Sequence, residues 1–272
     1  MLAIKNNIMA ANAARHLGVS YNSLARSVER LSSGLRINSA KDDAAGLAVR
    51  ELMRADIGVL EQGARNAQDG ISMLQTMEGA MAVIDAVLVR LKQLAEQAAT
   101  GSYSSAQRTL MNSEFEEMAA EIERIARATK FNNITLLNSA TRTISIHFGN
   151  TNDFITVQGT DMTRSALGIM TTQVTIANPT SAKAALATLD SAIATKDAAR
   201  ARFGYKMNRL EGTINVLNIQ RENLMGSESR VSDVDVATET AELTRNQVLA
   251  QAGVAMLTQA NTMPQMALQL LM

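Results

Sequence analysis

The chain has 272 residues and no cysteine, so it can hold neither a disulfide nor a thiolate metal site. Its 26 Lys and Arg residues balance its 26 Asp and Glu residues, which removes any whole-chain argument for binding nucleic acid. Aromatic residues make up only 3% and tryptophan is absent, whereas 46% of the chain is apolar. This composition favours slender helix-on-helix packing over a thick globular core.

The first predicted helix carries apolar residues at alternating spacings of three and four and ends at the turn-rich cluster Ser32–Gly34. Its predicted seam is Ala10, Ala14, Leu17, Tyr21, Leu24, Val28 and Leu31. Ser39 then precedes Asp42 by three positions, a weak capping-box pattern for a second helix that enters at Ala44. Glycines at 58, 63, 70 and 79 indicate either close approach of neighbouring backbones or local breaks.

The second helix is expected to reach about Thr100, and a third follows the loop Gly101–Ser105. The seam of the second helix is Leu74, Met77, Met81, Ile84, Leu88, Leu91, Ala95 and Ala98. The seam of the third is Met111, Phe115, Met118, Ile122 and Ile125. Each stripe is stable only when another helix covers it.

Between about 140 and 178 the apolar period changes from helical to two. Ile144, Ile146 and Phe148 alternate with polar residues, a turn follows at 149–153, and the chain continues into 154–157. This pattern predicts a β-hairpin, with residues 174–176 as a third strand.

A long heptad helix is expected to begin near Ser181, and at about 1.5 Å per residue it would be roughly 60 Å long. Its seam is Leu186, Leu189, Ile193, Phe203, Met207, Leu210, Ile214, Leu217 and Leu224. Only Lys196, Arg200 and Arg221 interrupt that series. A helix of this length is typical of a rod.

The C-terminal stretch is expected to restart after Gly226–Ser227 and to be helical from about Val234. Its predicted seam is Leu243, Ala250, Val254, Leu257, Leu268 and Leu271. Pro264 should kink or locally break this last helix. The predicted fold is therefore mainly α: a long antiparallel helical rod or coiled coil with a small central β-hairpin region at about 141–178, and both termini at one end.

Charge is distributed unevenly. Residues 1–54 hold eight basic and four acidic side chains, whereas residues 226–272 hold two basic and five acidic ones. Opposite signs suit mutual pairing of the two ends, within one chain or between neighbours. The alternative is two solvated faces of opposite sign.

Four segments resemble the signatures of bacterial flagellins. Residues 31–46 (LSSGLRINSAKDDAAG) and 64–72 (ARNAQDGIS) resemble N-terminal blocks, and 229–235 (SRVSDVD) and 246–253 (NQVLAQAG) resemble the C-terminal signature. The resemblance covers about 1–139 and 180–272.

The resemblance implies a structural subunit that self-assembles into the flagellar filament for swimming motility. Residues 1–40 and 230–272 would form a discontinuous inner-core coiled-coil domain, and 41–229 an outer-core helical domain without the variable outer domains of longer members. The alternative function is a hook–filament junction (hook-associated) protein. A cytosolic coiled-coil enzyme or scaffold would explain neither signature.

The resemblance also implies partners and a location. These are a homopolymeric helical filament, an export chaperone on the C-terminal segment, and filament cap and hook-associated proteins. The N-terminus turns polar before a signal core could form, and no run approaches 18 apolar residues, so we expect export without a cleavable signal and no membrane insertion. The expected place is the extracellular filament, or a periplasmic flagellum.

A recognition surface is expected on Arg90, Leu94 and Gln97, which lie about one helical turn apart, together with Glu114 on the next helix. In flagellins similar to this chain, the matching face is read by the animal flagellin-sensing Toll-like receptor. The alternative is that these residues serve lateral packing in the filament.

No catalytic, cofactor or metal site is expected. The two histidines, His16 and His147, are far apart in sequence, and the run from Asp233 has Thr238 and Thr244 where a calcium loop needs Gly and Glu. Asp42 and Asp43 are expected to cap a helix. We therefore predict that the chain is not an enzyme.

Overall fold

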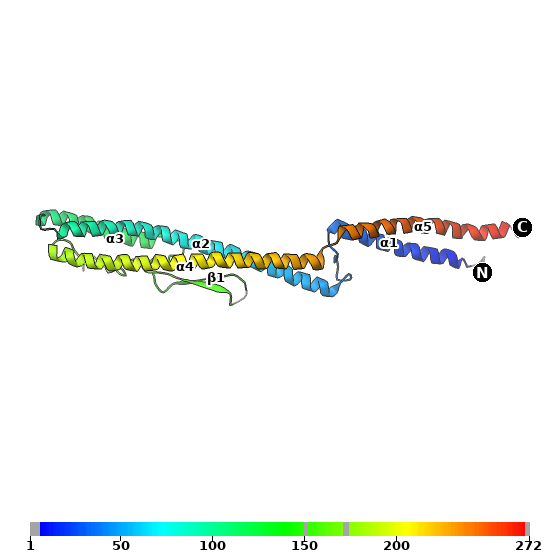
Figure 1. Ribbon diagram of the computed structural model, residues 1–272, viewed down its shortest axis with the longest axis horizontal. Helices are drawn as coiled ribbons and strands as arrows, with labels where there is room; N and C mark the ends of the chain where they lie inside the picture. Colours follow the sequence, from blue (N-terminus) through cyan, green and yellow to red (C-terminus); the bar gives the residue numbers. More distant parts are fainter. Residues whose placement is uncertain (1–5, 150–151, 171–173, 270–272) are drawn as a thin grey trace. The chain divides into compact units, whose positions relative to one another are not determined.

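The computed structural model describes residues 6–149, 152–170 and 174–269, and within them it has five α-helices and one two-stranded antiparallel sheet (Figure 1). In chain order these are α1 (Ile8–Ser33), α2 (Ala44–Ala99), α3 (Ser105–Ala128), β1 (Thr143–His147), β2 (Phe154–Gln158), α4 (Pro179–Ser232) and α5 (Val236–Gln269). The predicted class, mainly α with a small central hairpin, is confirmed.

The chain divides into two compact units. Unit 1 consists of residues 1–57 and 222–272, and unit 2 of residues 58–221. The sequence prediction puts the boundaries in the loops near 40 and 230, whereas these units divide inside α2 and α4. A continuous helix can serve two packing environments because its backbone hydrogen bonds do not depend on its neighbours.

The core of unit 2 is built on the predicted seam of α2. All eight of its residues, from Leu74 to Ala98, have no exposed surface. Phe115 and Ile122 of α3 and Leu189 and Phe203 of α4 are buried in the same cluster. By length and mean hydropathy, α2 is the one helix within the described residues that could cross a membrane. Its apolar stripe, however, is this core.

Ion pairs occupy two of the three predicted interruptions of the α4 seam, Lys196 and Arg200. Lys196 is only 2% exposed, and its ammonium contacts Asp85 of α2 and Asp197 of α4. One turn further on, Arg200 pairs with Glu78 of α2 at 3.3 Å. As position rises along α4 it falls along α2, so the two helices run antiparallel in unit 2, and polar residues on the seam help to fix their register.

The β-hairpin lies against α2. Ile144 pairs with Val157 and Ile146 with Ile155, so the predicted alternation puts one apolar face of the hairpin into the core. A Cβ added to Gly63 of α2 would lie 2.0 Å from the carbonyl oxygen of Phe148. Only glycine permits this approach. Of the two alternatives predicted for the glycines of this helix, Gly63 therefore marks a close backbone contact and not a local break.

The predicted third strand at 174–176 is wrong. Residues 171–173 lie outside the described part, and 174–176 pair with no strand. The amide of Ile176 and the hydroxyl of Thr175 instead donate to Oδ1 of Asn112 in α3, each at 2.9 Å. Because a side chain satisfies this backbone, the segment needs no sheet partner.

Two predicted helix breaks are also absent. Helix α4 continues through Gly226 to Ser232, and α5 continues through Pro264 to Gln269. The actual break is at 233–235, where the amide of Arg36 donates to the carbonyl of Ser232 at 2.7 Å and that of Val234 to Gly34 at 3.1 Å. Helix α4 therefore ends where its backbone bonds to the distant segment 34–36, and not at the local glycine Gly226.

The start of α2 differs from the predicted capping box. The Ser39 hydroxyl and amide donate to the Asp42 carboxylate, both at 2.9 Å, which closes a turn before the helix. Asp43 accepts from the amide of Gly46 at 2.8 Å, so it supplies the side-chain bond of an N-cap. The expectation that Asp42 and Asp43 have capping and turn roles is thus met, with Asp43 and not Ser39 at the cap.

Candidate assembly interface

Helices α1 and α5 form an antiparallel pair in unit 1, with Cα atoms that approach within 8 Å (Figure 1). Small side chains permit this distance. A Cβ added to Gly253 of α5 would lie 3.0 Å from Cδ1 of Leu17 in α1. Ala10, Ala13, Ser20 and Ser27 line the same contact from α1, and Asn246, Ala250 and Ala260 line it from α5; all are buried or half-buried.

The inner face of α1 is rotated from the predicted seam. Its buried and half-buried residues are Ala10, Ala13, Leu17, Ser20, Ser23, Leu24, Ser27, Arg30 and Leu31, and all but Ser23 and Arg30 repeat every seven residues from Ala10 or Ala13. Leu17, Leu24 and Leu31 were predicted for the seam, but Tyr21 is 49% exposed and Val28 52% exposed. Three residues after Leu17 and Leu24, the small side chains of Ser20 and Ser27 are half-buried and buried, whereas the residues four after them are exposed.

The inner face of α5 consists of Leu243, Asn246, Ala250, Gly253, Leu257 and Ala260. Leu243, Ala250 and Leu257 agree with the predicted seam, whereas Val254 is 45% exposed and lies outside the pair. The side chain of Leu268 and all of Leu271 lie outside the described residues. Whether any of these residues contacts another subunit stays a prediction.

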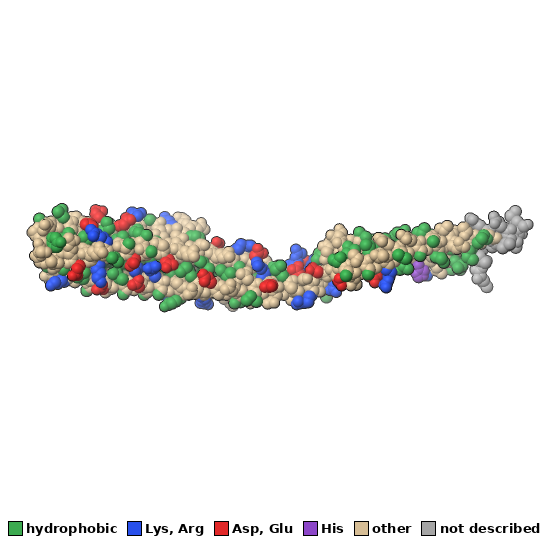
Figure 2. Space-filling view, turned by 45° about the horizontal axis from the view of Figure 1, so that its top comes forward, with side chains coloured by type: hydrophobic (Ala, Val, Ile, Leu, Met, Phe, Trp, Pro, Cys, Tyr) green, Lys and Arg blue, Asp and Glu red, His purple; other side chains and the backbone are tan. Residues whose placement is uncertain are grey.

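Several apolar side chains of unit 1 face away from the pair, as Figure 2 shows for one side. Those of α1 and α5 with 45% or more of their surface exposed are Ile8, Met9, Val19, Tyr21, Val28, Val236, Val248, Leu249, Val254, Met256 and Met266. Tyr21 and Val254 also border a groove with Leu24, Ala250 and two glutamines. We call this set the outward apolar residues. Two helices alone cannot cover both faces of each other, so these side chains are left for other surfaces to bury.

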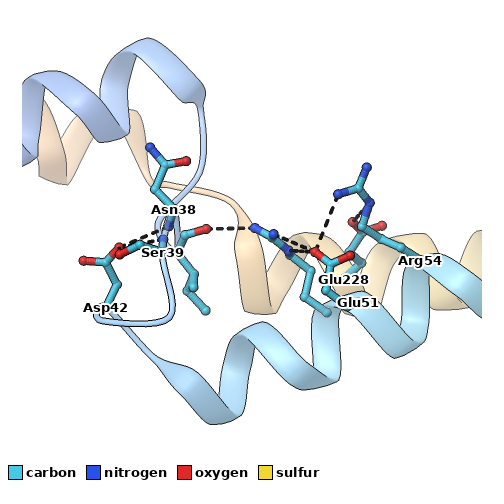
Figure 3. Close-up of polar contacts among 8 residues, drawn as sticks. Asn38, Ser39, Asp42, Glu51, Arg54 and Glu228 are labelled. Atoms are coloured by element: carbon cyan, nitrogen blue, oxygen red, sulfur yellow. Dashed lines mark hydrogen bonds and ion pairs between the residues drawn. The ribbon is translucent and has the colours of Figure 1, made fainter.

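Opposite charges pair across unit 1, as the uneven charge distribution predicts. Arg30 of α1 lies 3.5 Å from Glu239 of α5, and Arg54 of α2 lies 3.7 Å from Glu228 of α4. Figure 3 shows the second pair beside Glu51. Arg50, only 8% exposed, donates to the carbonyl of Ile37 at 2.8 Å and ties the 34–43 segment to α2.

Two carboxylates at helix starts have lowered pKa values. The Ser39 hydroxyl and amide hold the pKa of Asp42 below its ordinary 3.8 (Figure 3). Asp235 caps α5: the Thr238 hydroxyl, followed by the amide of Ala237, lowers its pKa in the same way. Both groups are therefore ionised near neutral pH, as suits a helix N-terminus.

The predicted recognition surface is only partly exposed. Arg90 and Glu114 form an ion pair at 2.5 Å on the surface of unit 2, and Gln97 is also exposed. Leu94 is 1% exposed and lies in the core, so its prediction as an apolar contact for a partner is wrong. The position i+4 from Arg90 falls on the buried stripe of α2, because that stripe also recurs every three or four residues.

Within the described residues, no group of three or more His, Asp or Glu side chains is arranged to hold a metal ion. Sequence reasoning missed Ala13, Ser20, Ser27, Asn246 and Gly253 of the pairing faces. Their signal is small size at heptad spacing, which a search for bulky apolar residues overlooks.

Comparison with known proteins agrees with this architecture. The family profile "Bacterial flagellin N-terminal helical region" matches residues 4–142, and "Bacterial flagellin C-terminal helical region" matches residues 186–271. A flagellin of Halalkalibacterium halodurans is 41% identical over 271 residues, which cover 99% of this chain and 100% of that one. The flagellar filament 33 kDa core protein of Treponema phagedenis is 41% identical over 286 residues, with the same coverage.

Solved structures show the same fold. A crystal structure of Bacillus cereus flagellin superposes with a TM-score of 0.51 and 28% identity, covering 56% of this chain and 88% of that one. A putative flagellar hook-associated protein of Vibrio parahaemolyticus gives a TM-score of 0.58 at 14% identity, covering 71% and 100%. The second likeness concerns the fold alone.

These features define a structural, mainly helical protein whose two chain ends build one discontinuous unit and leave apolar surface unburied. The chain belongs to the bacterial flagellin family.

Proposed function

We propose that this flagellin, a structural subunit of the flagellar filament, self-assembles by burying the outward apolar residues of unit 1 against neighbouring copies. One observation carries the proposal: the α1–α5 pair exposes apolar side chains on the flanks of both helices. Burial of one Val or Leu side chain contributes about 1.5–3 kcal/mol. Contacts that repeat head to tail then extend an open helical polymer without closing a ring.

The groove residues Tyr21 and Val254 provide the test. Tyr21→Ser and Val254→Ser each remove a half-exposed apolar group, which we expect to cost about 1 kcal/mol of assembly free energy per subunit. The critical concentration for seeded polymerisation should therefore rise roughly fivefold. Asn22→Ser, on the exposed neighbour of Tyr21, is the matched control and should leave it unchanged.

Thermal unfolding of unit 2 should be the same in all of these proteins. If the two groove variants polymerise at the wild-type concentration, the outward apolar residues do not drive assembly. If the wild-type chain forms no filament from seeds, the proposed function itself fails. No catalytic step is part of this proposal.

We infer that α5 is covered by an export chaperone before assembly, because Val248, Leu249 and Met256 are each 50% or more exposed. Export through the flagellum's own channel, for swimming motility, and contact with filament cap and hook-associated proteins belong to the same proposal. The filament is extracellular or periplasmic. A hook-junction role gains no support, since the likeness to the Vibrio protein is one of fold alone.

Recognition by the animal flagellin-sensing Toll-like receptor is proposed for Arg90, Gln97 and Glu114 only. The exposed ion pair Arg90–Glu114 presents polar groups that a partner could contact, whereas Leu94 is buried and cannot be contacted. A reporter-cell assay of the monomer should show a weaker signal for Arg90→Ala. An unchanged signal would contradict the receptor proposal and favour the alternative that these residues serve lateral packing in the filament.

A further inference from the structure

The side chain of Asn7 uses both ends of its amide. Its Oδ1 accepts from the backbone amide of Ala10 at 3.1 Å, which makes Asn7 the N-cap of α1. Its Nδ2 donates to the backbone carbonyl of Ala260 in α5 at 2.8 Å. Of the residues that cap a helix well, Asp and Ser lack an amide that could make the second bond while accepting the first.

The carbonyl that Asn7 reaches is unusual within its helix. An α-helical carbonyl accepts from the amide four residues later, and the residue four after Ala260 is Pro264, which has no N–H. The sequence has only two prolines, and the other one, Pro179, begins α4. Ala260 is therefore the one position in α5 whose carbonyl loses its helical donor to a proline, and at 8% exposure it has little access to water.

The apolar pattern alone does not fix how α1 and α5 are aligned. Leu17, Leu24 and Leu31 recur every seven residues, as do Leu243, Ala250 and Leu257, so a slide by one heptad would again place apolar residues on the inner face. In coiled coils a single buried polar residue with one satisfying partner can select the register.

We propose that Asn7 is a positioning residue that holds the register of α1 against α5 by occupying the carbonyl that Pro264 leaves without a donor. It acts at the end of the pair away from the segment 34–36, whose backbone bonds to Ser232 and Val234 hold the other end. A slide of α1 by one heptad toward Val236 places Asn7 against the carbonyl of Gly253, which already has its helical donor in the amide of Leu257. It also leaves the carbonyl of Ala260 unpaired, which is costly for a buried group. The same contact explains why Pro264 does not break α5. The inference rests on the proposed function, since the pair must be formed in the filament.

The test compares full-length wild-type protein with N7D, P264A and the double variant N7D/P264A. N7D keeps a good capping oxygen but loses the donor, and P264A restores the helical donor of Ala260. We expect N7D to raise the critical concentration for polymerisation about tenfold, and to raise it less than about twofold when P264A is also present. N7S, which also caps without an amide, should behave as N7D.

Register is measured directly by disulfide trapping, for which the cysteine-free chain is a clean background. A Cβ on Gly253 would lie 3.6 Å from Cβ of Leu17, within disulfide range, so L17C/G253C reports the register of the structure. L17C/N246C reports the slide by one heptad that brings Asn7 to Gly253. N7D should increase trapping of the second pair at the expense of the first.

Each outcome decides the inference. Rescue of N7D by P264A, with shifted trapping in N7D, supports it even if N7D alone does not polymerise. Equal loss in both backgrounds, no loss in either, or trapping that N7D leaves unchanged overturns it. Failure of the wild-type protein to polymerise would instead overturn the proposed function.

Discussion

Lys196 is a charged residue on an apolar seam, and replacing it should cost unit 2 less stability than replacing its partner Asp85. The Lys side chain is 3% exposed, whereas those of Asp85 and Asp197 are 35% and 60% exposed. Burying a charge is costly even when it is paired, so an apolar side chain of similar length often serves as well. Removing one partner is worse, since the ammonium stays buried.

Loss of one partner of a fully buried ion pair costs about 3–5 kcal/mol. Asp85 is partly solvated and Asp197 still contacts the ammonium at 2.8 Å, so we expect a smaller loss of about 1–2 kcal/mol for Asp85→Ala. For a unit of this size that lowers the unfolding midpoint by about 2–8 °C. Lys196→Met should lie within about 1 kcal/mol of wild type, or be more stable.

Circular dichroism at 222 nm during thermal and urea unfolding of the monomer measures the stability change of Asp85→Ala and that of Lys196→Met. The exposed pair Lys92–Asp190 joins the same two helices at 2.5 Å and is the matched control. Lys92→Met and Asp190→Ala should each change stability by less than about 1 kcal/mol. If Lys196→Met loses more stability than Asp85→Ala, the reasoning about the buried charge is refuted.

The same residue predicts an alkaline limit. Burial acts to lower the pKa of Lys196, but hydrogen bonds to Asp197 and Asp85 outweigh it and raise the pKa above its ordinary 10.5. A raised folded-state pKa adds stability that is present below about pH 10.5 and is lost as pH rises through the folded value. Above that pH, wild type should lose stability relative to Lys196→Met.

Gly63→Ala should lower the unfolding midpoint by several degrees, because its Cβ would meet the Phe148 carbonyl, whereas Gly79→Ala, with nothing within 4 Å, should gain up to about 1 kcal/mol of stability. Thermal unfolding that improves equally in both would contradict the close contact. Asp235→Ala should weaken filaments at neutral pH by removing the cap of α5, while Asp235→Asn should not. Because the pKa of Asp235 is lowered, its cap is present above about pH 3.8 and is lost as pH falls further, so wild-type filaments should dissociate more readily than those of Asp235→Asn in sedimentation below that pH.

The long helices and the hairpin could be predicted because each has a strong period in its own sequence. The seam of α2 and the alternation at Ile144 and Ile146 need no knowledge of partners. The inner face of α1 is rotated relative to its predicted seam, and this rotation could not be predicted from the period of α1 alone. Ser20 is half-buried while Tyr21 is 49% exposed, and that difference depends on how closely two distant segments approach.

The errors at residues 174–176 and 264 are both accompanied by a hydrogen bond from elsewhere in the chain. Asn112 of α3 accepts from the amide of Ile176, and Asn7 donates to the carbonyl of Ala260 that Pro264 cannot serve. Nothing in the structure explains why α4 continues through Gly226. At Leu94 the error is of another kind. Helical spacing placed it near Arg90 and Gln97, but it did not reveal that Leu94 lies on the buried stripe of α2. Local sequence therefore specified the elements better than their faces.

Helix α1 is synthesised long before its partner α5, because α2, α3, the hairpin and α4 lie between them in the chain. All of unit 2 has been synthesised before the first residue of α5 is made. Translation that stops early would therefore yield a chain able to build the core around Phe203 but unable to pair its first helix. Completion of synthesis is thus a physical precondition for unit 1, whose two paired helices come from opposite ends of the chain.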